Sequence, residues 1–295
     1  MSTRDALLRA MPAVFVLIWS TGFVVARFGM PHAPPFTFLA VRYVLSLACF
    51  AAWIAWTRAA WPADRAQWLH LAVIGILMHA GYLGGVWAAV KSGIGAGTVA
   101  LLVGLQPLLT AVWLSAFSRD SKHHAVTALQ WLGLLLGLGG LALVVWRKLG
   151  AGEITPVNLA LAAGALLSIT TGTLYQKRHL APCDVRTANV VQLAAALVVT
   201  LPLVWLEHEP IDWDPAFIGA MAWSVFALTL GGSSLLYLLI QRGAATQVTS
   251  LLYLVPPCTA VMAWLIFGEP LTATMVIGMA LTALGVALVV RHPGS

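Results

Sequence analysis

One arginine and one histidine lie well inside long apolar segments of this chain, away from the segment ends, and they are the first candidates for chemistry. Arg42 stands six residues into the segment 36–57, and His79 lies near the centre of the segment 67–89. An arginine at this depth could extend its guanidinium toward the water and bind helix-end carbonyls, or it could anchor a substrate carboxylate or act as a gate. Histidine titrates near neutral pH, so His79 could contact a substrate, accept a proton or pack through hydrogen bonds.

No aspartate or glutamate falls inside any of the apolar segments. Proton-coupled pumps and carriers of organic cations usually depend on a carboxylate in the membrane, and a nucleotide-sugar carrier would need several buried bases. The segments therefore favour a neutral or zwitterionic, fairly apolar cargo that moves by facilitated diffusion. Proton-coupled export of drugs or other metabolites, with His79 as the titrating group, stays open as the alternative.

Polar and aromatic residues recur at helical spacing in several segments, where they could line a pathway. His79 and Tyr82 lie three residues apart, and Ser233 and Tyr237 lie four apart. Aromatic rings could stack an apolar side chain, and Arg42 or a helix N-terminus could hold a carboxylate. Such stripes also serve ordinary helix packing in membranes. The residues predicted to line a cavity on this basis are Trp19, Ser20, Arg42, His79, Tyr82, Gln106, Thr171, Ser233, Tyr237 and Tyr253.

Three prolines interrupt two of the apolar segments at corresponding positions. Pro107 lies in 96–117, and Pro256 and Pro257 lie in 246–267. Proline removes a helical hydrogen bond and bends the chain, so these points are predicted hinges for alternating access. Structural kinks without a hinge function are the alternative.

The composition requires a lipid environment. The chain is 60% hydrophobic and only 9% charged, whereas soluble domains are about 25% charged. The apolar runs are about 20 residues long, which predicts membrane-crossing helices rather than barrel strands. We expect an all-α integral membrane protein with ten transmembrane helices, near residues 12–27, 36–57, 67–89, 96–117, 125–146, 156–175, 186–206, 215–240, 246–267 and 271–290.

The basic residues predict the orientation of the chain. With the N-terminus inside, eleven Lys and Arg residues fall in inner loops and tails and four in outer loops. This positive-inside bias predicts that both termini are cytoplasmic, although Arg147 and Lys148 fall on the outer side. Because the bias accounts for the net charge of +6, we expect the lipid bilayer as a partner and no nucleic acid.

The chain repeats itself at an offset of 150 residues. Residues 93–117 return in diverged form at 243–267, and the offset pairs Arg42 with Gln192, so a charge stands in only one half. Two repeats in so apolar a chain are typical of transporters. Because five helices per repeat is an odd number, the second repeat is expected to be inverted. The expected units are 1–148 and 149–295.

Glycines predict how the fifth and tenth helices pack. Gly133 and Gly140 match Gly278 and Gly285 at an offset of 145, which is typical of close helix contact. The same faces could form a homodimer, and a monomer stays open. Neither a metal nor a cofactor is expected.

Four motifs carry a resemblance to a known family. W-S-T-G begins at Trp19, and P-x-T-x-x-x-x-R ends at Arg42. A G-x-x-x-G-T-x-A-L-L run begins at Gly93, and a G-E-P-L turn begins at Gly268. Together these motifs are similar to the EamA-type branch of the drug/metabolite transporter superfamily, over nearly the whole chain. The first repeat departs from the pattern, because it has 118–120 (S-R-D) where the second has G-E-P.

This resemblance implies a basket of ten helices around a central cavity, with alternating access and export across a bacterial inner membrane. Within the branch, the many aromatics and the carboxylate-free core are most similar to YddG-like exporters of aromatic and other apolar amino acids. The expected function is therefore a carrier for small zwitterionic metabolites.

Two other classes of protein remain as alternatives to a carrier. In an intramembrane enzyme, His79 with Ser20 or Ser233 could form a base and nucleophile, but no G-x-S-G or G-x-S-x-G motif is present. We therefore do not expect an enzyme. A non-transporting subunit of a larger complex is the second alternative, and it would need a co-purifying protein.

Overall fold

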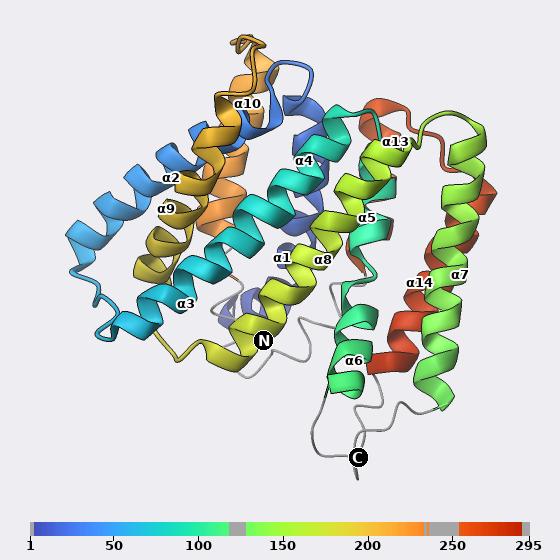
Figure 1. Ribbon diagram of the computed structural model, residues 1–295, viewed down its shortest axis with the longest axis horizontal. Helices are drawn as coiled ribbons and strands as arrows, with labels where there is room; N and C mark the ends of the chain where they lie inside the picture. The colour runs from blue at the N-terminus through green and yellow to red at the C-terminus, as the bar shows by residue number, and fades with distance from the viewer. Residues whose placement is uncertain (1–2, 118–127, 233–234, 236–253, 291–295) are drawn as a thin grey trace.

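The computed structural model describes residues 3–117, 128–232, 235 and 254–290, and every regular element in this part is a helix (Figure 1). The elements are α1 (Thr3–Gly29), α2 (Pro35–Thr57), α3 (Arg65–Gly75), η1 (Ile76–Leu83), α4 (Gly84–Lys91), α5 (Ala96–Val103), α6 (Gln106–Phe117), α7 (Ala128–Gly150), α8 (Pro156–His179), α9 (Val185–Val204), α10 (Pro215–Trp223), η2 (Ser224–Gly232), α13 (Val255–Phe267) and α14 (Ala273–Val290). The predicted all-helical architecture is confirmed.

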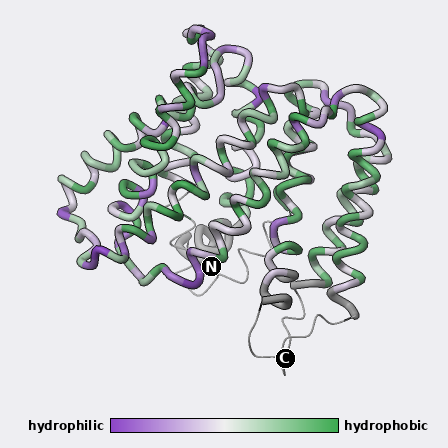
Figure 2. Tube along the Cα trace, in the orientation of Figure 1, coloured by the Kyte–Doolittle hydropathy of each residue, from purple (hydrophilic) through white to green (hydrophobic). Residues whose placement is uncertain are grey.

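In the described residues, six helical spans are long and apolar enough to cross a membrane. They are Pro35–Thr57, Arg65–Lys91, Trp131–Gly150, Pro156–His179, Val185–Val204 and Pro215–Gly232, and shorter apolar helices occur at Ala13–Gly29, Ala96–Thr110, Val255–Phe267 and Ala273–Leu288. Figure 2 shows hydrophobic residues along the helix bodies, with hydrophilic ones most frequent near their ends. Ten crossings stay a prediction, because parts of the predicted helices 215–240 and 246–267 lie outside the described residues.

The outer surface of the bundle is apolar. Trp56 is 88% exposed, Trp146 is 79% exposed and Leu265 is 68% exposed. Large apolar side chains of this kind are normally covered in a soluble monomer. Their exposure fits a surface that faces lipid, so the apolar spans act as membrane helices.

Helices from the two halves of the chain pack against their counterparts. α2 packs against α9 and α7 against α14, and α5 packs against α13, which belong to the corresponding segments 96–117 and 246–267. Figure 1 shows α2 and α9 at one side of the bundle and α7 and α14 at the other. Likewise, α4 and η1 pack on α8, while α10 and η2 pack on α1. Each half therefore completes its core with the other half.

Two of the elements are π-helices, which sequence analysis did not predict. η1 lies within the continuous helix Arg65–Lys91, and η2 directly follows α10. At the offset of 150, η1 overlaps η2, with Gly81 aligned to Gly231. In a π-helix the backbone hydrogen bonds reach back five residues. Such turns are rare in proteins overall, and those that occur are often found at functional sites. Both π-helices face the cavity described below.

The glycines of α7 and α14 bring these two helices into close contact. A Cβ atom added at Gly140 would lie 2.5 Å from the carbonyl oxygen of Gly278, and one at Gly285 would meet the backbone of Gly133 and Gly137. The predicted close packing of the fifth and tenth helices is thus present within one chain. The glycine faces of α7 and α14 are covered by each other, so a homodimer through the same helices would have to use another face.

Two glutamates from loops hold the starts of two helices. Glu207 accepts hydrogen bonds from the backbone N–H groups of Phe36 at 3.0 Å and Thr37 at 2.7 Å, at the start of α2. Glu269, in the G-E-P-L turn, accepts one from the N–H of Ala96 at 3.1 Å, at the start of α5. Carboxylates stabilise free N–H groups at helix starts. The turn that carried the family resemblance therefore joins the start of α5 to the end of α13.

Candidate functional site

A central cavity lies between α1, α2, η1, α4 and η2. Measured as the room open to the centres of water molecules, its volume is about 90 Å³, and roughly 10–15 Å³ of such room holds one water molecule. The residues that line it are Trp19, Gly22, Phe23, Arg42, Met78, His79, Tyr82, Leu83, Val86, Trp87, Leu228 and Thr229. Among the described residues, the lining is therefore largely apolar and aromatic, with one arginine, one histidine and no acidic residue.

Arg42 is buried between α2 and η2, with 7% of its surface exposed. Its Nε and one Nη donate hydrogen bonds to the hydroxyl oxygen of Thr229, at 3.1 and 3.0 Å. The Thr229 hydroxyl in turn donates to the carbonyl oxygen of Ser224, at 2.9 Å. The alternative in which Arg42 extends to the water is therefore wrong. Within the described part of the chain, no carboxylate lies within ion-pair distance of this guanidinium.

His79 occupies the opposite half of the site, on η1. The hydroxyl of Tyr43 donates a hydrogen bond to the backbone carbonyl oxygen of His79, at 2.9 Å. The side chain of Gln192, on α9, faces the imidazole. The backbone of His79 is thus held by α2, and its ring lies opposite α9.

The polar contacts of Arg42 and His79 correspond to each other in the two halves of the chain. The offset of 150 aligns Arg42 with Gln192 and His79 with Thr229. We call the Arg42–Thr229 pair the arginine contact and the His79–Gln192 pair the histidine contact. The arginine contact joins α2 to η2, and the histidine contact joins α9 to η1. Each contact therefore has one partner on a π-helix.

Aromatic side chains form the rest of the cavity wall, and two of them pack against further aromatic rings outside the lining. Trp87 stacks on Phe38, with ring centroids 4.4 Å apart and planes 24° apart. Trp19 packs against Phe15, with centroids 5.3 Å apart. Such ring pairs add to the stability gained by burial alone. The cavity therefore presents rigid flat surfaces to an apolar guest.

The structure brings four of the predicted cavity residues together, namely Trp19, Arg42, His79 and Tyr82. Three others make contacts outside this cavity. Ser20 is buried and donates to the carbonyl oxygen of Val16 at 2.7 Å, Gln106 donates to Thr173 at 2.9 Å, and Thr171 donates to the carbonyl oxygen of Leu167 at 2.8 Å. Ser233, Tyr237 and Tyr253 lie outside the described residues.

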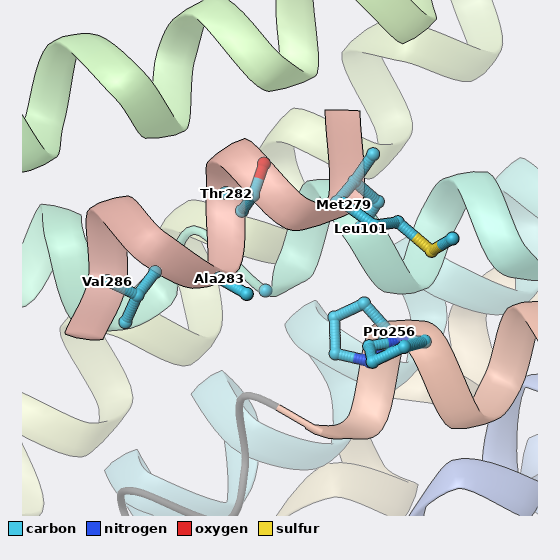
Figure 3. Close-up of a pocket in the computed structure, with 8 residues that line it drawn as sticks. Leu101, Pro256, Met279, Thr282, Ala283 and Val286 are labelled. Carbon is cyan, nitrogen blue, oxygen red and sulfur yellow. The ribbon is translucent and has the colours of Figure 1, made fainter. Parts of the chain in front are cut away.

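The three predicted hinge prolines lie in the first turns of two helices. Pro107 is the second residue of α6, which follows a break after α5, and Pro256 and Pro257 begin α13. A Cβ atom at Gly104, within that break, would lie 2.8 Å from the Pro256 ring. Figure 3 shows the small pocket that Pro256 lines together with residues of α14. The break between α5 and α6 therefore contacts the start of α13 at Pro256.

Comparison with known proteins places this architecture in a family. The model of the EamA-like transporter family matches the chain twice, over residues 10–146 and 157–291. The chain belongs to the EamA-like transporter family. The family is described as a transporter family. This agrees with the carrier that the sequence predicts and not with the alternative of an intramembrane enzyme.

Similar EamA-like transporters cover nearly the whole chain. An uncharacterized transporter of Bacillus subtilis (strain 168), YvbV, is 26% identical over 290 residues, which is 97% of this chain and 92% of the relative. A probable amino-acid metabolite efflux pump of Escherichia coli (strain K12) is 22% identical over 295 residues, 97% of this chain and 94% of the relative. The uncharacterized inner membrane transporter YedA of the same strain is 24% identical over 288 residues, 96% and 91% of the two chains. A crystal structure that is 18% identical has the same fold, with a TM-score of 0.65 over 95% of both chains.

Sequence analysis missed several cavity residues of this EamA-like transporter. Thr229, Phe23 and Trp87 line the cavity but stood in no polar stripe. For Thr229 a signal existed, because the repeat offset aligns it with His79. Phe23 and Trp87 are apolar residues in apolar helices, so nothing in the pattern separates them from core residues.

Proposed function

We propose that this protein is a carrier of a bacterial inner membrane that exports small zwitterionic metabolites, chiefly aromatic and other apolar amino acids. The observation that carries the proposal is the central cavity, whose aromatic walls surround one buried arginine without a carboxylate partner in the described residues. Arg42 would hold the substrate carboxylate, while Trp19, Tyr82 and Trp87 would contact the apolar side chain. The names of the Escherichia coli relatives, an amino-acid metabolite efflux pump and an inner membrane transporter, support the cargo class and the membrane.

The proposed topology is ten crossings in two inverted repeats, 1–148 and 149–295, with both termini in the cytoplasm. The two matches of the family model, over 10–146 and 157–291, support the division. The pairing of α2 with α9 and of α7 with α14 supports two related halves. An inverted repeat gives a carrier two equivalent ways to open its cavity, one toward each side of the membrane.

Alternating access would take place at the starts of α6 and α13. The first turns of α6 and α13 contain Pro107, Pro256 and Pro257, and the break before α6 packs on α13. A broken helix lets one half move while the other half stays packed, so a rearrangement at the break would be felt at the start of α13. We propose these three prolines as the hinge.

Facilitated diffusion is the proposed mode of transport, because the described residues that line the cavity include no carboxylate to carry a proton. One observation favours a second mode, which is the position of His79 within the cavity. An imidazole that titrates during the cycle would couple export of a drug or metabolite to protons.

Efflux of labelled phenylalanine from proteoliposomes tests the proposal. We expect efflux that requires the protein and is unchanged by an imposed pH gradient. Flux against the concentration gradient, driven by protons, would establish the second mode instead. Arg42→Gln should reduce the flux at least about tenfold through loss of a charge-assisted contact, while the exposed Arg65→Gln should leave it unchanged. Absence of phenylalanine flux in the unaltered protein would overturn the proposed cargo.

A further inference from the structure

We infer that the central cavity also takes apolar monocarboxylates that lack an ammonium group, of which 3-phenylpropionate is an example. The inference rests on the proposed function, because it treats this cavity as the transport site. It names a second class of substrate, and it follows from the charges and hydrogen bonds around Arg42.

The guanidinium of Arg42 has donors to spare. It carries five N–H groups, and two of them are directed at the Thr229 hydroxyl. Threonine is neutral, so the positive charge stays uncompensated within the described residues. A carboxylate would supply both the opposite charge and two acceptor oxygens for the remaining donors.

The cavity offers little to an ammonium group. As far as the structure describes it, the lining contains one permanently charged side chain, Arg42, and no aspartate or glutamate. An ammonium group inside it would lose water without gaining an ion pair, and it would also be repelled by the guanidinium. The Trp19, Tyr82 and Trp87 rings could attract a cation through their faces, but this attraction is weaker than a full ion pair.

The charge balance therefore differs between the two classes of guest. An amino acid brings one negative and one positive charge to a cavity that has one positive charge, so its ammonium is best left at the water-facing mouth. A monocarboxylate brings only the charge that Arg42 lacks, and its apolar remainder matches walls such as Phe23, Trp87 and Leu228. The carboxylate is the shared feature that both guests present to Arg42.

Three ligands with the same phenyl ring separate these contributions. 3-Phenylpropionate has the carboxylate alone, phenylalanine has both groups, and phenethylamine has the ammonium alone. Binding of each to the purified full-length protein in lipid nanodiscs is measured by titration calorimetry at neutral pH. We expect 3-phenylpropionate to bind at least as tightly as phenylalanine, and phenethylamine to bind at least about tenfold more weakly than either.

Variants at two arginines assign the effect to the cavity. Arg42→Gln should weaken 3-phenylpropionate binding at least about tenfold, Arg42→Lys should retain part of it, and the exposed Arg65→Gln should bind as the unaltered protein does. Should the glutamine variant fail to give a monodisperse protein, the ligand series on the unaltered protein decides. Equal binding of phenethylamine and 3-phenylpropionate would overturn the inference.

The outcomes for the two proposals can be told apart. Phenylalanine efflux without 3-phenylpropionate binding would support the proposed function and overturn this inference. Binding of 3-phenylpropionate without phenylalanine efflux would support the inference for the cavity and overturn the amino-acid cargo. Loss of both would overturn both.

Discussion

The arginine contact and the histidine contact join corresponding residues of the two halves, yet they differ in charge. Arg42 donates to Thr229 from a guanidinium that is always protonated. His79 and Gln192 occupy the same places in the other half and bring no permanent charge. The two halves therefore share a framework of π-helix and partner helix, and only one of them carries the fixed positive charge.

Because of this difference, the fixed positive charge lies on one side of the cavity only, between α2 and η2. Two equivalent halves can exchange their arrangements when the cavity opens to one side or the other. The charge, however, stays on the α2–η2 side in both arrangements, so a substrate carboxylate would remain at the same residue throughout. The histidine side is then free to differ in shape, and it supplies Tyr82 and the backbone held by Tyr43.

Thr229→Val tests the arginine contact and should have the largest effect. Valine has the shape of threonine without its hydroxyl, so the buried guanidinium would lose the acceptor that holds it. We expect the free energy of unfolding to fall by about 3 kcal/mol, since the unpaired group is charged. Thermal unfolding of the purified protein in detergent measures the loss.

Thr229→Ser is the matched control, because serine keeps the hydroxyl on the same backbone position. It should unfold close to the temperature of the unaltered protein. Saturating 3-phenylpropionate should stabilise the valine variant more than the serine variant, since a carboxylate replaces the lost acceptor. Equal loss in both variants would mean that Thr229 acts by packing alone.

His79→Ala and Tyr82→Ala test the other side of the cavity. Both side chains line it and neither carries the fixed charge, so each change should slow phenylalanine efflux by about fivefold without lowering expression. The size follows from the loss of ring contact, which is about 1 kcal/mol for a packed aromatic pair. Unchanged rates in proteoliposomes would remove these two residues from the transport site.

The sequence was sufficient for the membrane architecture, for a physical reason. Apolar runs of about 20 residues without carboxylates can cross a membrane as helices, because a helix satisfies its backbone N–H and C=O groups internally. The same rule explains why Glu207 and Glu269 are found at helix starts, where N–H groups satisfy them. The π-helices could not be predicted, because a backbone that reaches back five residues rather than four leaves no distinct pattern of side chains.

Sequence analysis could predict a cavity residue only where its side chain cannot form a hydrogen bond to its own helix. Arg42 and His79 cannot bond to their own helix as a hydroxyl can, so their presence in apolar segments pointed to a shared site. Ser20 and Thr171 were chosen from the same spacing, but their hydroxyls donate to carbonyl oxygens of the preceding turn. Helical spacing does not distinguish these two situations, because both put the side chain on one face.

Gln192→Leu tests the histidine contact and should have the smallest effect of the series. The amide faces the imidazole without a permanent charge, and even a neutral hydrogen bond between them would contribute only about 1 kcal/mol to stability. Because leucine is apolar and similar in size, part of even that loss should be recovered by packing among the helices. Val198→Leu, on the exposed face of α9, is the control and should unfold like the unaltered protein. A loss as large as that of Thr229→Val, measured by the same thermal unfolding, would mean that the histidine contact holds a charge as well. The fixed charge would then not distinguish the two halves, and a carboxylate would have two places to bind instead of one.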